Sequence, residues 1–156
     1  MDAAPPILSA DELRFLRLLH EKGVDYLVVG LAAAALQGAP LVTQDVDLWF
    51  RSLADPRLGE ALREVGAAYV PPTGLHPPTL AGSAVQLFDI VVSMHGLREF
   101  QDEAAESLTI DVAGVPVRVL PLERIVASKR ALGRDKDRLV LPVLEEALKL
   151  LRQRET

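Results

Sequence analysis

Three aspartates set among apolar residues are the side chains of this sequence best suited to chemistry. Asp45 and Asp47 stand one residue apart in "TQDVDLWF" (43–50), and Asp89 stands inside "LFDIVVS" (87–93). Aspartate is depleted in strands, and a buried carboxylate is costly unless something compensates its charge. Because side chains alternate across a strand, we predict that Asp45 and Asp47 project from one face while the intervening apolar residues cover the core.

Carboxylates held this close together repel each other unless one is protonated or a cation lies between them. Magnesium suits such a place, because it prefers hard oxygen ligands and keeps room for water and substrate phosphates. If the strand with Asp89 lies beside the strand with Asp45 and Asp47, the three carboxylates converge on a site for two Mg²⁺ ions. The alternative is that Asp45 and Asp47 lie on the solvated face of an edge strand and that Asp89 is unrelated to them.

The hydrophobic pattern predicts an α+β fold, in which helices pack against a mixed β-sheet and two helices end the chain. Ser9 and Glu12 have the spacing of a capping box, Gly23 suits a helix end, and Pro142 marks a kink or a late start in the last helix. We expect one domain over residues 1–156, because no linker or repeat divides the chain. The expected elements are helices over 9–23, 31–38, 55–66, 121–134 and 135–155, strands over 24–30, 45–50 and 85–93, a hairpin over 107–120, and a loop over 71–83.

Composition narrows the classes of function. The net charge of −5 argues against a protein that coats nucleic acid by bulk electrostatics, and the lack of cysteine excludes disulfides and zinc–thiolate sites. None of the three histidines stands in an HExxH arrangement, and His95 is expected as a loop residue. No secretory signal and no membrane span is recognised, so we expect a soluble, cytoplasmic domain.

The segment "YLVVGLAAAALQGAPLVTQDVDLWF" (26–50) resembles the nucleotidyltransferase superfamily with the polymerase beta-like fold. That superfamily combines a glycine turn at a helix N-terminus, a pair of acids between apolar residues, and a third acid on a neighbouring strand. Gly30, Asp45, Asp47 and Asp89 match these positions. The C-terminal "ASKRALGRDKDR" (127–138) is similar to the closing segment of bacterial stand-alone members, including the minimal nucleotidyltransferases of toxin–antitoxin systems.

The resemblance implies transfer of a nucleoside monophosphate from a nucleoside triphosphate to a hydroxyl acceptor, which is a small molecule, an RNA or a protein. Two magnesium ions would be held by the three aspartates, and Asp89 would act as general base. The triphosphate would meet the helix that begins after Gly30 and the cationic side chains that follow. The expected nucleotide-binding residues are Gly30, Leu31, Lys129, Arg134 and Lys136.

Two features leave alternatives open. Leu31 stands where the superfamily has glycine or serine, and Val42 stands near the place where relatives often carry arginine. The chain is then alternatively a weak or inactive member of the same fold that acts as an antitoxin-like or regulatory partner of another protein. For the cations near Lys129, the alternative to nucleotide binding is that they are solvated helix residues that pair with nearby acids.

Overall fold

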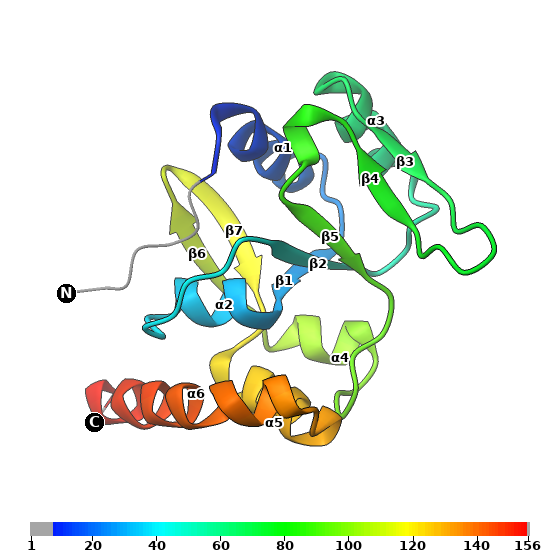
Figure 1. The fold of residues 1–156 in the computed structure, drawn as a ribbon. Helices are drawn as coiled ribbons and strands as arrows, with labels where there is room; N and C mark the ends of the chain where they lie inside the picture. The colour runs from blue at the N-terminus through cyan, green and yellow to red at the C-terminus, as the bar shows by residue number, and fades with distance from the viewer. Residues whose placement is uncertain (1–7, 156) are drawn as a thin grey trace.

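A mixed five-stranded β-sheet organises the computed structural model, which describes residues 8–155 (Figure 1). The strands of this sheet are β1 (Tyr26–Val29), β2 (Val46–Phe50), β5 (Phe88–Val91), β6 (Leu108–Val112) and β7 (Val115–Val119). Two further strands, β3 (Ala68–Val70) and β4 (Thr79–Ala81), form a separate antiparallel pair. The helices are α1 (Ala10–Glu21), α2 (Gly30–Leu36), α3 (Pro56–Glu64), the short 3-10 helix η1 (Ser83–Val85), α4 (Phe100–Ala105), α5 (Leu122–Leu132) and α6 (Asp135–Arg154).

The spatial order of the sheet is β5-β2-β1-β7-β6, which places strands from both halves of the chain side by side. The pairs β1–β2 and β6–β7 are antiparallel, whereas β1–β7 and β2–β5 are parallel. Parallel neighbours need long crossover connections, and here the chain between β2 and β5 carries α3 and the β3–β4 pair. The predicted α+β class with a mixed sheet is therefore confirmed.

Helices cover both faces of the sheet. In Figure 1, α1 and α3 lie on one face, and α2, α5 and α6 lie on the other. The alanines of α2 are almost fully buried, which lets this helix approach β2 and α5 closely. The longest helix, α6, packs along α5 through residues that include Leu144 and Ala147, and both are buried.

The predicted caps of the first helix are present. Ser9 Oγ accepts a hydrogen bond from the Glu12 backbone N–H at 3.1 Å, and Glu12 Oε1 accepts one from the Ser9 N–H at 2.8 Å. Glu12 Oε2 also accepts a bond from the Leu87 N–H, and the Leu87 carbonyl accepts one from the Val46 N–H. The N-terminal end of α1 is thus tied to the beginnings of the two strands that carry the predicted aspartates.

The structure differs from the expected elements in a few short segments. The segment expected as a loop over 71–83 contains β4, and neither β3 nor α4 was expected. These elements have only three to six residues, so tertiary context rather than a local pattern decides them. Helix α6 runs without interruption from Asp135 through Pro142, so the late start is wrong. Among the described residues, no helix is both long enough and apolar enough to cross a membrane.

Candidate functional site

Asp47 and Asp89 lie directly opposite each other on neighbouring strands. The parallel pairing of β2 with β5 places Val46 beside Phe88 and Asp47 beside Asp89. Directly opposed residues of paired strands point to the same face of the sheet, so the two carboxylates share one face. Asp45 lies just before β2 rather than inside it, which corrects the expected strand boundary by one residue.

Gly30 brings the end of β1 against the Asp47 carboxylate. Val29 pairs with Asp47 across the antiparallel β1–β2 ladder, and Gly30 follows with φ of +67°. A β-carbon built on Gly30 would stand only 2.7 Å from Asp47 Oδ2. Both the left-handed backbone and the close approach therefore require glycine at this position.

The electrostatic environment disfavours the ionised form of these two acids. Burial raises the pKa of Asp47, and the neighbouring charges of Asp89 and Asp45 raise it further, whereas Lys129 and Lys136 lower it. Asp89 is more exposed, and partial burial and the charge of Asp45 raise its pKa as well. The site therefore holds mutually repelling carboxylates.

Opposite the carboxylates, α5 and the start of α6 supply cations. Lys129 Nζ lies 3.3 Å from Asp137 Oδ1, and Arg134 Nε lies 2.7 Å from Asp137 Oδ2. The hydrogen bond from Arg134, opposed by burial and assisted by Lys129, lowers the pKa of Asp137 to about 2. Two of the predicted nucleotide-binding cations therefore share one buried acid, which matches the alternative that they pair with nearby acids. Lys136 is exposed, and none of the ion pairs found among residues 8–155 involves it.

A cavity of about 580 Å³ is lined both by the carboxylates beside the sheet and by the cations of α5 and α6. Of the predicted site residues, Asp89 alone is not part of its wall. The predicted residues that line the cavity are Gly30, Leu31, Asp45, Asp47, Lys129, Arg134 and Lys136. Leu31 is half-buried there, so its side chain occupies part of the wall near the carboxylates.

Several further residues line the cavity without having been predicted as site residues. Asp137 and the buried Ser128 face it from the helices, and His95 faces it from the loop after β5. Gly96 fixes that loop against α5, because a β-carbon there would stand 2.5 Å from Ala131 Cβ. The i, i+3 spacing of Arg134 and Asp137, which suits an ion pair on one helix face, was the available signal for Asp137.

The donor chemistry of this site fits a divalent cation. Asp45, Asp47 and Asp89 offer hard carboxylate oxygens, and their mutual repulsion is what a bound cation would relieve. As the side chains stand, however, no three His, Asp or Glu residues within 8–155 come close enough together to form a complete ligand set. The three carboxylates are electrostatic neighbours, and the expected convergence on metal ions is not preformed.

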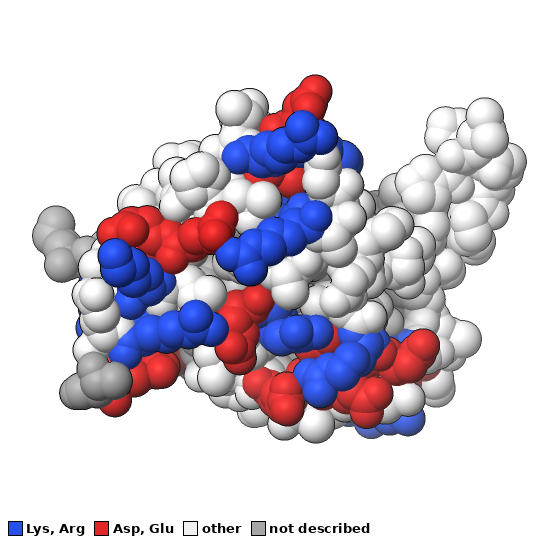
Figure 2. Space-filling view, turned by 90° about the horizontal axis from the view of Figure 1, so that it is seen from below, with Lys and Arg blue, Asp and Glu red and all other residues white. Residues whose placement is uncertain are grey.

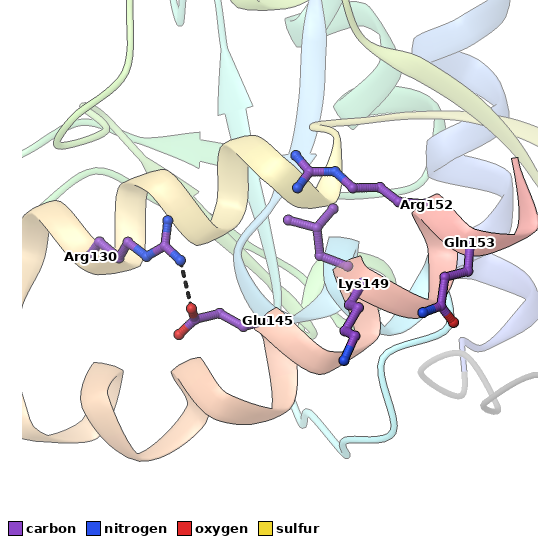
Figure 3. Close-up of a pocket in the computed structure, with 6 residues that line it drawn as sticks. Arg130, Glu145, Lys149, Arg152 and Gln153 are labelled. Carbon is purple, nitrogen blue, oxygen red and sulfur yellow. Dashed lines mark hydrogen bonds and ion pairs between the residues drawn. The ribbon is translucent and has the colours of Figure 1, made fainter. Parts of the chain in front are cut away.

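A second hollow, of about 410 Å³, lies between α5 and α6 and is less suited to chemistry (Figure 3). Its wall includes Arg130, Lys149 and Arg152, but Arg130 Nη2 lies 2.6 Å from Glu145 Oε2 and Arg152 Nη2 lies 3.4 Å from Glu123 Oε2. Figure 2 shows that acidic and basic side chains alternate over this face rather than forming a uniformly basic surface. The cavity beside Asp47 is therefore the better candidate for a catalytic site.

Comparison with known proteins identifies the fold of this chain. Searches of known protein families and of curated protein sequences find no match to this chain. Among solved structures, the chain has the fold of nucleotidyltransferases, with matches that cover nearly its whole length.

Three of these structures illustrate the likeness. ANT(2″)-Ia in complex with adenylyl-2″-tobramycin has a TM-score of 0.55 at 16% identity, over 92% of this chain and 95% of that one. A candidate nucleotidyltransferase from Thermotoga maritima has a TM-score of 0.57 at 19% identity, over 88% and 94%. An antigenic nucleotidyltransferase-like protein from Paracoccidioides brasiliensis has a TM-score of 0.56 at 21% identity, over 94% and 79%. At these identities the likeness establishes the fold.

Proposed function

We propose that this chain is a magnesium-dependent nucleotidyltransferase that moves a nucleoside monophosphate from a nucleoside triphosphate to a hydroxyl acceptor. The observation that carries the proposal is the pairing of Asp47 with Asp89 on adjacent parallel strands. A fold that places two uncompensated carboxylates side by side next to a cavity loses stability unless a cation joins them. The likeness to nucleotidyltransferase structures supports the same proposed function.

Asp45, Asp47 and Asp89 would hold the metal ions. When bound, magnesium would neutralise phosphate charge and stabilise the attacking and leaving oxygens of an in-line displacement. The acceptor oxygen would attack the α-phosphorus. The bond between that phosphorus and the oxygen that bridges it to the β-phosphorus would break, and pyrophosphate would leave. Asp89, on the strand beside Asp47, would take the hydroxyl proton.

The cations opposite would receive the phosphates. Lys129, Arg134 and Lys136 would contact the triphosphate, and Gly30 and Leu31 would form the wall beside it. The acidic lining residues Asp45, Asp47 and Asp137 equal these three cations in number among the described lining residues, so the cavity alone offers no net positive charge. Binding of a triphosphate should therefore depend strongly on added divalent cations.

The acceptor is best sought among small molecules that carry hydroxyl groups. The structure of ANT(2″)-Ia contains adenylyl-2″-tobramycin, an adenylylated small molecule, and shares this fold. An RNA acceptor is less well supported, because acidic and basic side chains alternate over the face formed by α5 and α6 (Figure 2).

The test is a transfer assay with labelled ATP, GTP, CTP and UTP, magnesium, and a panel of hydroxyl acceptors. The variant Asp47→Asn should lose at least roughly a hundredfold in rate, since it removes a proposed metal ligand and even partners of such ligands cost up to that much. Asp111→Asn is the matched control, because Asp111 is an exposed strand aspartate on β6, at the opposite edge of the same sheet. An Asp47→Asn enzyme as active as the control would refute the mechanism.

Leu31 favours a second candidate, a catalytically weak or inactive binding module of the same fold that acts as an antitoxin-like or regulatory partner. Its side chain lines the cavity where the superfamily pattern has glycine or serine, and it adds bulk near the expected phosphate position. Thermal melting separates the candidates, since a ligand that binds only the folded state raises the melting temperature. A shift with a nucleotide and magnesium supports the enzyme, and no shift with any of the four nucleotides supports the module.

A further inference from the structure

Asp137 is a buried acid shared by two cations at the wall of the cavity. Its side chain is 1% exposed, and its two oxygens contact Lys129 from α5 and Arg134 from the start of α6. Arg134 contributes two guanidinium contacts, from Nε to Oδ2 at 2.7 Å and from Nη2 to Oδ1 at 3.1 Å. The bidentate geometry fixes the plane of the guanidinium as well as its distance from the acid.

The backbone fixes the direction of this carboxylate. Gly133 ends α5 in the left-handed region with φ of +60°, and Arg134 then caps α6. The Arg134 backbone N–H donates to Asp137 Oδ2 at 3.1 Å, which completes one half of a capping box. Asp137 is thereby held by the backbone at the start of its own helix as well as by the two cations.

Lys129 interacts with both Asp137 and Asp47. Its ammonium contacts Asp137 Oδ1, its side chain is 16% exposed, and its charge lowers the pKa of Asp47 on the opposite wall. A lysine ammonium has three donors, and the contact with Asp137 occupies one of them. The remaining donors belong to a side chain that lines the cavity, so a group bound there can accept from them.

We infer that Asp137 is a positioning residue that holds Lys129 and Arg134 in place for the phosphates of a nucleoside triphosphate. The inference rests on the proposed function, since it assigns these two cations to the nucleotide. Flexible cationic side chains lose entropy when they bind phosphate, and a buried acid that orders them beforehand reduces that loss. Asp137 itself would touch neither the substrate nor the metal.

A matched control for a purely structural role exists elsewhere in the chain. Glu103 is fully buried and contacts Arg124 at 2.8 Å and Arg98 at 3.2 Å, so it too is one acid between two cations. Glu103 is not among the residues that line the cavity beside Asp47. Glu103→Gln and Asp137→Asn should both lower stability, but only Asp137→Asn should weaken the binding of a triphosphate.

The experiment measures dissociation constants by calorimetry for ATP, GTP, CTP and UTP with magnesium, and for the matching monophosphates, at a temperature where every variant is folded. The variants are Asp137→Asn, Asp137→Glu, Lys129→Met, the double variant Asp137→Asn/Lys129→Met, and Glu103→Gln. The readout is the preference for triphosphate over monophosphate, which a loss of stability alone does not change.

Asp137→Asn should reduce this preference roughly tenfold, as expected for the loss of one well-placed charged contact. Asp137→Glu, which keeps the charge, should recover part of the preference, and Glu103→Gln should match the wild type. If Asp137 acts through Lys129, the double variant should be little worse than Lys129→Met alone.

Each contrary result has its own meaning. A wild-type chain that binds no triphosphate refutes the proposed function and this inference with it. A wild-type chain that binds triphosphate, together with an Asp137→Asn variant that binds it equally well or more tightly, refutes the positioning role and leaves the proposed function standing. Should Asp137→Asn fail to fold, the result for Asp137→Glu decides, with an unchanged preference counting against the inference.

Discussion

Four acids of the described chain form two pairs that differ in how their charge is compensated: Glu103 and Asp137 on one hand, Asp47 and Asp89 on the other. Burial raises the pKa of Glu103, but hydrogen bonds from Arg124 and Arg98 outweigh it and lower that pKa to about 2. Asp137 likewise has its cations in direct contact. Asp47 and Asp89 have no ion pair among the described residues, and each has other carboxylates as neighbours.

Acids with direct cation contacts stabilise the fold, whereas acids without them lower its stability. A compensated buried acid joins elements, as Glu103 joins α4, α5 and the chain before α4. An uncompensated pair lowers stability and is expected where a bound cation completes the structure.

The largest effect on stability is expected for the compensated group. Glu103→Gln leaves two arginines facing a neutral side chain, and breaking such a pair should lower the free energy of unfolding by about 3 kcal/mol. Urea denaturation measures the loss. A loss below about 1 kcal/mol would show that the Glu103 cluster is no more than a surface ion pair.

The next effect concerns the backbone beside Asp47. Gly30→Ala combines a left-handed backbone with a β-carbon 2.7 Å from Asp47 Oδ2, and it should cost about 2 kcal/mol. Gly66→Ala is the control, because Gly66 has φ of +70° and nothing within 4 Å of the added carbon. Equal losses in the two variants would mean that the contact with Asp47 contributes nothing.

A smaller effect of opposite sign is expected for the uncompensated group. Asp47→Asn removes a repelling charge, so without divalent cations at pH 7 the variant should unfold at a slightly higher temperature than the wild type. Magnesium and nucleotide should then stabilise the wild type and leave the variant unchanged. A variant that melts well below the wild type without metal would show that the Asp47 charge is compensated after all.

The smallest effect is a dependence on pH. The raised pKa of Asp47 means that its favourable contribution is present below its ordinary pKa of 3.8 and is lost as pH rises through the raised value. The melting-temperature advantage of Asp47→Asn should therefore shrink as the solution is acidified. Glu103 and Asp137 act oppositely, since their contribution is lost as pH falls from their ordinary values toward about 2. An advantage of Asp47→Asn that stays constant from pH 7 to pH 4 would contradict this assignment.

The sequence was sufficient to predict the main elements and to place Asp47 and Asp89 on strands. The apolar neighbours of Asp47 and Asp89 identified the interior strand β2 and the edge strand β5, and the capping box of Ser9 and Glu12 gave the start of α1. These features depend on residues near each other in the chain, so local patterns reveal them.

The contacts around the cations of α5 and α6 could not all be predicted from local sequence patterns. The contact of Lys129 with Asp137 follows from the packing of α6 on α5 after Gly133, whereas the Arg134–Asp137 pair joins residues only three positions apart. The place of His95 at the cavity wall follows from the packing of Gly96 against Ala131. Such contacts arise only when the whole fold is assembled.

Direct titration of Mn²⁺, as a substitute for Mg²⁺, tests most directly whether Asp47 and Asp89 bind a divalent cation. Calorimetry in the presence of a non-hydrolysable triphosphate should detect Mn²⁺ binding to the wild type and to Asp111→Asn, with at least roughly tenfold weaker binding to Asp47→Asn. Absence of Mn²⁺ binding to the wild type, or equal binding to Asp47→Asn, would contradict the account.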